Sequence, residues 1–341
     1  MTMSIVLGSV GFLVAAICAG LMGYAIQRGA TCTVAAVDEL VRKRRATRLL
    51  SMLEASLWVV GGLLIAQALG MLGTMPAGYA IGVTTVVGGI LLGVGAFVNG
   101  ACVFGAIARL GSGEWAYLAT PIGFYAGCVS LQHAHVLPQA QKLSYGSPVL
   151  QASAWVALIV VGLMAARILA GLRATQNGDA MRSVWQRWRG GLAMRIWSPH
   201  AATTVIGITF VAMLLLVGAW AYTDVLAELA RGMSKDLIAR TALVLALFGG
   251  AALGGWTAGR FKSTRVRVSQ LARCFVGGVM MGWGSLVIPG SNDGLILIGI
   301  PLLWPYAWLA FFTMLVSIAA AELMQSSLAT SISRGTRPTG R

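Results

Sequence analysis

Charge is scarce in this sequence. Asp, Glu, Lys and Arg make up 10% of its 341 residues, whereas soluble domains contain about 25%. Acidic residues are rarer than basic ones, with 10 Asp and Glu against 25 Lys and Arg. Hydrophobic residues form 57% of the chain, and many apolar stretches approach or exceed the roughly 20 residues that a membrane-spanning helix needs. The composition excludes a soluble globular protein and predicts an all-α, polytopic membrane protein.

The formal net charge of +15 does not indicate a nucleic-acid partner, because of where the basic residues lie. Lys and Arg gather in short segments between apolar stretches, at residues 42–48, 173–199 and 260–273. Cytoplasmic loops of membrane proteins carry this excess, and such loops contact anionic lipid headgroups. We therefore expect these segments in the cytoplasm, the lipid bilayer as a partner, and no nucleic acid.

The sequence also lacks the motifs of most metal and cofactor sites. Its five cysteines are scattered without a Cys-x-x-Cys pair, which argues against a disulfide framework and a zinc site. His133 and His135 have no third ligand nearby. No Walker motif occurs, and the Gly93-x-Gly95 pair follows no strand. We expect no metal, no cofactor and no ATP-driven transport by this chain alone. The N-terminus has no basic n-region, so we expect the first helix to be retained.

A glycine-rich stretch at residues 88–113 is the most informative part of the chain. It reads GGILLGVGAFVNGACVFGAIARLGSG, with a polar interruption from Asn99 to Cys102 and no charge before Arg109. Non-helical backbone is tolerated inside a bilayer only where it is buried in protein or lines a cavity. The stretch therefore predicts a broken helix with a thiol at the break, lining a pore.

The same pattern returns 189 residues later. Glycines 277, 278, 282, 284 and 294 align with glycines 88, 89, 93, 95 and 105, and Ser291 aligns with Cys102. This register predicts two pseudo-repeats, and two unrelated glycine-rich helices are the alternative explanation. With the N-terminus outside, the two copies would cross the membrane in opposite directions, as in the inverted repeats of many transporters.

Along the whole chain the apolar stretches predict about nine spanning or nearly spanning helices. They lie at residues 4–26, 51–72, 79–98, 115–129, 149–172, 201–222, 239–259, 275–288 with a short exit helix at 295–303, and 304–323. A short return helix is expected at residues 33–41, and a polar loop with Asp224, Glu228 and Asp236 is expected between 222 and 239. We divide the chain into a membrane half at 1–172, a basic cytoplasmic linker at 173–199 that is partly an interfacial amphipathic helix, a second membrane half at 200–325, and a cytoplasmic tail at 326–341.

Three motifs resemble those of the YeeE/YedE (sulfur transport) family, and the resemblance covers most of residues 15–325. The first is Gln27-Arg28-Gly-Ala-Thr-Cys32. The second, and most specific, is Gly93-x-Gly95-(x)6-Cys102-x-x-Gly105-(x)3-Arg109-Leu-Gly-x-Gly113. The third is Gly277-Gly278-(x)3-Gly282-x-Gly284-(x)6-Ser291-x-x-Gly294.

The resemblance implies a permease of the bacterial inner membrane that takes up thiosulfate or a related small sulfur-containing anion. It implies an hourglass of helices whose half-helices meet near mid-membrane, with Cys32 and Cys102 as the thiols that hand the anion inward through weak S–H contacts. The family carries a cysteine where this chain has Ser291, whose hydroxyl donates a hydrogen bond but cannot accept a sulfane sulfur covalently. Asp293, if ionised, would repel an anion. Either the substrate differs from thiosulfate or two thiols are enough, and the sequence leaves both open.

Side-chain chemistry is consistent with an anion path. Short half-helices direct unpaired N–H groups and positive dipole ends toward a cavity. Arg28 and Arg109 would supply positive charge, unless they snorkel to the interface. Cys32 and Cys102 have the alternative role of small buried hydrophobes, and Gln27 and Asn99 either line the path or bond across helices. The candidate substrate-binding residues are Gln27, Arg28, Cys32, Asn99, Cys102, Arg109, Ser291 and Asn292.

A different function class stays open beside transport. A membrane sulfurtransferase or sulfur-relay module would carry a persulfide on Cys32 or Cys102. A soluble thiol sulfur carrier on the cytoplasmic side is a candidate partner under either reading. We expect the permease, and therefore a transporter and no enzyme.

Overall fold

The structure is a computed structural model that describes residues 9–134, 140–176, 196–232 and 236–335. Within these ranges the chain is helical, and the single β-bridge joins Tyr79 to Lys142. Six helices are long and apolar enough to cross a membrane, or seven if one bent pair counts as a span. The expected multi-pass helical class is confirmed, and the count of nine spans stays a prediction.

The helices and helical turns have the following bounds, in chain order. They are α1 (Val10–Gly29), α2 (Thr33–Lys43), α3 (Thr47–Ala68), α4 (Val83–Asn99), α5 (Val103–Gly111), the 3-10 turn η1 (Trp115–Leu118), α6 (Ala119–His133), α7 (Ala154–Gln176), α9 (Pro199–Val217), α10 (Tyr222–Ala230), α11 (Leu237–Thr257), α12 (Val268–Val287), α13 (Asn292–Gly294), the π-helical turn η2 (Leu295–Gly299) and α14 (Pro305–Gly335).

Four of the long helices end at a break and continue as a short helix. The pairs are α1 with α2, α4 with α5, α9 with α10, and α12 with α13 and η2. Each break contains one residue with positive φ, namely Ala30, Gly100, Gly218 or Gly290. A residue in this region of φ ends a helix without continuing it, and glycine adopts it most easily. The N-caps of the short helices are all buried, so these helices begin inside the bundle; they are Cys32, Cys102, Ala221 and Ser291.

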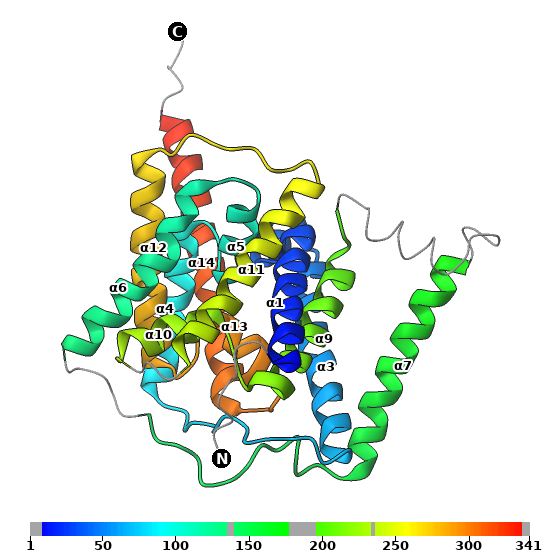
Figure 1. Ribbon diagram of the computed structural model, residues 1–341. Coiled ribbons are helices and arrows are strands. Elements are labelled where there is room, and N and C mark those ends of the chain that lie inside the picture. The colour runs from blue at the N-terminus through cyan, green and yellow to red at the C-terminus, as the bar shows by residue number, and fades with distance from the viewer. Residues whose placement is uncertain (1–8, 135–139, 177–195, 233–235, 336–341) are drawn as a thin grey trace.

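Two groups of helices make up the body of the molecule (Figure 1). α12 packs against α4 and α6, and α14 packs against α4; in the other group, α1 packs against α11 and α9, and α9 packs against α3. α7 stands at the edge of the bundle in Figure 1 and packs against α3. Arg167 on α7 binds both carboxylate oxygens of Glu54 on α3, at 2.9 and 3.0 Å.

Glycines allow α4 and α12 to cross with their backbones in contact. A Cβ on Gly277 would lie 2.6 Å from the Gly95 carbonyl oxygen, and one on Gly95 would lie 2.9 Å from the Gly277 oxygen. Gly88 and Gly284 face each other in the same way, at 3.1 and 2.8 Å. Real Cβ atoms do not fit at such distances, so this crossing requires small residues, as is common between membrane helices.

Two expectations about local structure are wrong. The return helix expected at 33–41 is α2, which continues the path of α1, so that Val10–Lys43 forms one candidate span. The polar loop expected between 222 and 239 is largely α10, which carries Asp224 in its first turn. An acid in the first turn interacts favourably with the positive end of a helix. The expectation is wrong because it treats charged residues in the sequence as the sign of a solvated loop.

Parts of the predicted domain layout lie outside the described residues. These are most of the linker at 173–199, with its expected interfacial helix, and the end of the tail at 326–341.

Candidate functional site

Cys32 and Cys102 occupy the same kind of position at two different breaks. Cys32 is the N-cap of α2 and Cys102 is the N-cap of α5, both in extended backbone. The Thr33 amide donates to the Cys102 Sγ at 3.1 Å, and the Cys102 amide donates to the Cys32 Sγ at 3.4 Å. Both thiols are buried, Cys102 completely. Two distant parts of the chain thus form one thiol pair, with each sulfur held by a backbone amide of the other break.

Two residues of the second break explain why the thiols can meet. A Cβ on Gly105 would lie 2.4 Å from the Cys32 Sγ, so this glycine leaves the room that the sulfur fills. The Asn99 Nδ2 donates to the backbone carbonyl two residues later at 2.6 Å, and its Oδ1 accepts from the Thr120 hydroxyl at 2.8 Å. Asn99 therefore stabilises the break through hydrogen bonds across to α6.

The break before α13 contributes a hydroxyl and a carboxyl group. Ser291 is the N-cap of α13; its Oγ donates to the Asp293 carboxylate and lies 2.6 Å from the Thr223 Oγ1. Thr223 also donates to the Asp293 carboxylate, with its Oγ1 at 2.8 and 3.0 Å from the two oxygens. Because Thr223 comes from the start of α10, the third and fourth breaks meet at this cluster, as the first and second meet at the thiols.

Asn292 connects the two clusters. Its Oδ1 accepts from the Thr33 hydroxyl at 3.3 Å, one residue away from Cys32. Its Nδ2 is fully buried and has no hydrogen-bond partner among the described residues. A buried N–H group without an acceptor is costly, so this position is suited to bind an oxygen atom of a ligand.

Two cavities reach this centre from opposite ends of the bundle. One, of about 460 Å³, is lined by the start of α12 and the end of α14 and includes Cys32. The other, of about 300 Å³, is lined by the end of α12 and the start of α14 and includes Ser291 and Thr223. We name the first the inner cavity, because the basic segments 42–48 and 260–273 both line it, and the second the outer cavity. The two segments thus lie at the same end, as predicted.

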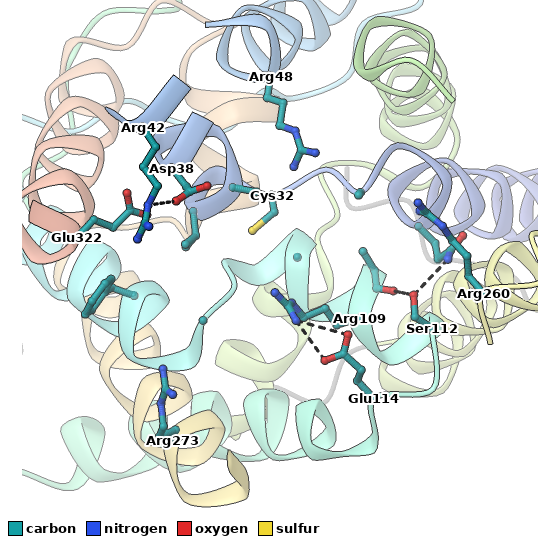
Figure 2. Close-up of a pocket in the computed structure, with 18 of the residues that line it drawn as sticks. Cys32, Asp38, Arg42, Arg48, Arg109, Ser112, Glu114, Arg260, Arg273 and Glu322 are labelled. Carbon is teal, nitrogen blue, oxygen red and sulfur yellow. Dashed lines mark hydrogen bonds and ion pairs between the residues drawn. The ribbon is translucent and has the colours of Figure 1, made fainter. Parts of the chain in front are cut away.

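Arginine is the main charged residue of the inner cavity (Figure 2). Its charged lining residues are Arg42, Arg48, Arg109, Arg260 and Arg273, with Asp38, Glu114 and Glu322. Arg42 pairs with Asp38 at 2.6 Å, and Arg109 pairs with Glu114 at 3.2 Å. The arginines outnumber the acids, so the cavity has a positive field that attracts anions.

Gln27 and Arg28 are neighbours in the sequence but face different surroundings. Gln27 lines the inner cavity, and its Nε2 donates to Ser112 at 3.3 Å. Arg28 lines neither cavity; its Nη2 donates to the Tyr24 hydroxyl at 2.7 Å and to Thr257 at 2.8 Å, which ties α1 to α11. Consecutive residues on a helix point about 100° apart, and this rotation turns Arg28 away from the thiols.

The predicted site residues therefore fall into four groups. Cys32, Cys102, Ser291 and Asn292 converge at the centre, Gln27 and Arg109 line the inner cavity, Asn99 stabilises a break, and Arg28 joins two helices. Thr223 was missed by the sequence reasoning. The glycine at 218 inside an apolar stretch, followed by Thr-Asp, was the signal that could have identified a further break. The described residues contain no group of three or more His, Cys, Asp or Glu placed to hold a metal ion.

Comparison with known proteins now connects this centre with a family. The family described as Sulphur transport matches residues 28–320. This chain belongs to the sulphur transport family. One relative is the thiosulfate transporter TsuA of Escherichia coli (strain K12), 23% identical over 337 residues that cover 90% of this chain and 92% of the relative.

Membership in the sulphur transport family confirms the family that the three motifs predicted. Together with the apolar helices, it makes this chain a multi-pass membrane protein, which in bacteria lies in the inner membrane. The match begins at Arg28 and includes the three N-cap positions Cys32, Cys102 and Ser291. The sulphur transport family is, by its description, a family of transporters.

Proposed function

We propose that this chain is a permease that takes up thiosulfate, or a related small sulfur-containing anion, through the centre between the outer and inner cavities. The observation that carries this proposal is the thiol pair. Cys32 and Cys102 lie buried between the two cavities, and the Sγ of each accepts a hydrogen bond from a backbone amide of the other break. The similarity to a thiosulfate transporter over nearly the whole chain supports this substrate class.

The groups at the centre match both ends of a thiosulfate ion. A thiol is soft and polarisable and contacts the terminal sulfur through its weak S–H donor. The Asn292 Nδ2, which lacks a partner, would donate to an oxygen at the other end. The first turns of α2 and α5 add amide donors and a positive dipole end. An anion would pass from Ser291 to Cys102, then to Cys32, and leave through the arginine-rich inner cavity.

We also propose that nine spans form two halves related by an inverted repeat, at 1–172 and 200–325. Ser291 lies 189 residues after Cys102 and Ala221 lies 189 residues after Cys32, and all four are N-caps of short helices. The same register relates the two glycine contacts of α4 with α12, since Gly88 meets Gly284 while Gly95 meets Gly277. Reciprocal contacts of this kind are what a two-fold relation between halves produces.

The inner cavity has room for a second event, the capture of the anion by a soluble thiol sulfur carrier. Its positive lining would hold an anion close to the cytoplasmic opening. We propose such a carrier as a partner on that side.

Uptake of labelled anions tests the function. A sulfur-auxotrophic bacterium that expresses this chain should accumulate labelled thiosulfate well above an empty-vector strain, with sulfite and selenite as competitors. Absence of thiosulfate uptake by a strain that inserts the protein in its membrane would contradict the proposal. Mass spectrometry of Cys102 during turnover should detect no persulfide; a persulfide that forms at the rate of uptake would instead support a sulfur relay.

A further inference from the structure

Asp293 is a buried carboxyl group at the entrance to the thiol pair. Its side chain is 3% exposed, and it accepts hydrogen bonds from Thr223, from Ser291 and, at 3.1 Å, from the Gly294 amide. None of the ion pairs among the described residues includes it. Burial away from water disfavours the charged form of this carboxyl group, whereas the three donors favour it, so the group is placed to exchange a proton.

The neighbouring elements do not neutralise this charge. α10 contributes Tyr222, Asp224, Glu228 and Arg231, α11 contributes Arg240, α14 contributes Tyr306, and the thiol Cys102 lies on the inner side. Arg240 is paired with Glu228 at 2.6 Å. Glu228 is neutralised by Arg240, which leaves Asp224 and Asp293 with one cation, Arg231, so the outer side has no excess of positive charge, in contrast to the inner cavity.

An anion that moves past Ser291 therefore meets a like charge. Ser291 hydrogen-bonds Asp293, so an anion held by that hydroxyl lies beside the carboxylate. Two like charges in contact repel strongly where the surroundings are poorly polarisable. The repulsion disappears if the carboxylate binds a proton, and the resulting O–H becomes a donor to the anion.

We propose that Asp293 binds one proton with each anion, so that this chain is a proton–anion symporter. The inference rests on the proposed uptake function and adds its driving force. The proton reaches Asp293 from the outer cavity through the hydroxyls of Ser291 and Thr223, which line that cavity and hydrogen-bond the carboxyl group. After the anion moves on to Cys102, water that enters from the inner cavity accepts the proton, and the carboxylate returns to its three donors.

Liposomes that contain the purified chain provide the test. The membrane potential is clamped at zero with a potassium ionophore and equal potassium on both sides, and the outside is made more acidic. With labelled thiosulfate as the probe, a difference of about one pH unit should drive up to about tenfold accumulation for one proton per anion. A pH-sensitive dye inside should report acidification that depends on added thiosulfate.

Asp293→Asn removes the group that binds the proton and keeps the size and shape of the side chain. This variant should still admit thiosulfate down its concentration gradient, with no accumulation and no thiosulfate-dependent acidification. Asp236→Asn is the matched control, because Asp236 precedes α11 with a φ of +56° that Asn tolerates. It should accumulate thiosulfate as the parent does.

The outcomes separate this inference from the proposed function. Downhill thiosulfate entry in the parent without accumulation or acidification overturns symport and leaves the permease intact. No entry at all in the parent overturns both. If Asp293→Asn accumulates thiosulfate like the parent, Asp293 is not the proton site. If that variant does not fold, the acidification measured with the parent decides the question of symport by itself.

Discussion

The breaks at Cys102 and Ser291 use the same backbone device for different chemistry. Each follows a glycine-rich helix, contains a glycine with positive φ, Gly100 or Gly290, and ends at an N-cap in extended backbone. At the first break a thiol pairs with another thiol, whereas at the second a hydroxyl pairs with a hydroxyl and a carboxyl group. The backbone fixes the position of the N-cap, and the N-cap side chain decides which chemical group stands there.

The two breaks also differ in shape. α4 and α5 together remain one candidate span from Val83 to Gly111, while α12 and the following turn are bent by 51°. The short helix after the second break is a three-residue turn followed by the π-helical η2, in place of a regular α-helix. π-helical turns are frequently found at functional sites.

Replacing the thiol of the first break should have the largest effect. Cys102→Ala should lower thiosulfate uptake by at least about tenfold, because loss of one buried hydrogen-bond partner costs about 1–3 kcal/mol. The free energy of unfolding should also fall by about 1–3 kcal/mol, because the buried Thr33 amide loses its acceptor. Uptake in liposomes and thermal unfolding in detergent measure the two effects.

Cys128→Ala is the matched control for this variant. Cys128 is equally buried on α6 and contacts the Gly282 carbonyl, and it lines neither cavity. Its loss should leave uptake unchanged. Parental uptake by Cys102→Ala would mean that the path depends on backbone donors and charge alone.

One added methyl group should disrupt the crossing of α4 and α12, which places the two breaks relative to each other. Gly277→Ala would place a Cβ 2.6 Å from the Gly95 carbonyl oxygen, and such overpacking should lower the free energy of unfolding by about 1–3 kcal/mol. Gly249→Ala, on α11 with open space around it, should be neutral or stabilising. Equal melting temperatures for the two variants would show that α4 and α12 do not cross in contact.

Replacing the N-cap residue of the second break should have the smallest effect on uptake, and it tests directly whether the N-cap side chain accounts for the difference between the two breaks. Ser291→Cys restores a third thiol, and we expect thiosulfate uptake relative to sulfite to rise by about threefold, a change below 1 kcal/mol. Ser285→Cys, which also lines the outer cavity, is the control and should leave that ratio unchanged. If the uptake of thiosulfate relative to sulfite falls in Ser291→Cys, the natural substrate is one that binds a hydroxyl better than a thiol at this position.

The sequence predicted the centre best where glycine and polar residues interrupt an apolar stretch. Gly100 and Gly290 require such an interruption because of their φ values. Cys102 and Ser291, which the motifs placed at the interruptions, are the N-caps of the helices that follow. The glycine register at an offset of 189 identified residues that lie at the crossing of α4 and α12.

Direction and burial of polar residues were harder to predict. A sequence motif does not show which side of a helix a residue faces. Arg28 and Gln27 were therefore both candidates for the substrate path, although only Gln27 lines a cavity. Asn99 was a candidate for the path, yet its amide is engaged in hydrogen bonds across the break. The segment with Asp224 and Glu228 looked like a solvated loop because composition cannot distinguish a half-buried acid on a helix from an exposed one in a loop. Its position became clear only through the contacts of Thr223 with Ser291 and Asp293.

The amides that hold the two sulfurs belong to the main chain, and this has a consequence for evolution. Substitution of a side chain cannot delete the N–H groups at Thr33 and Cys102, with proline as the one exception. Mutation at the centre can therefore exchange the side chains at the N-caps, whereas the amides that hold the sulfurs persist through every other substitution.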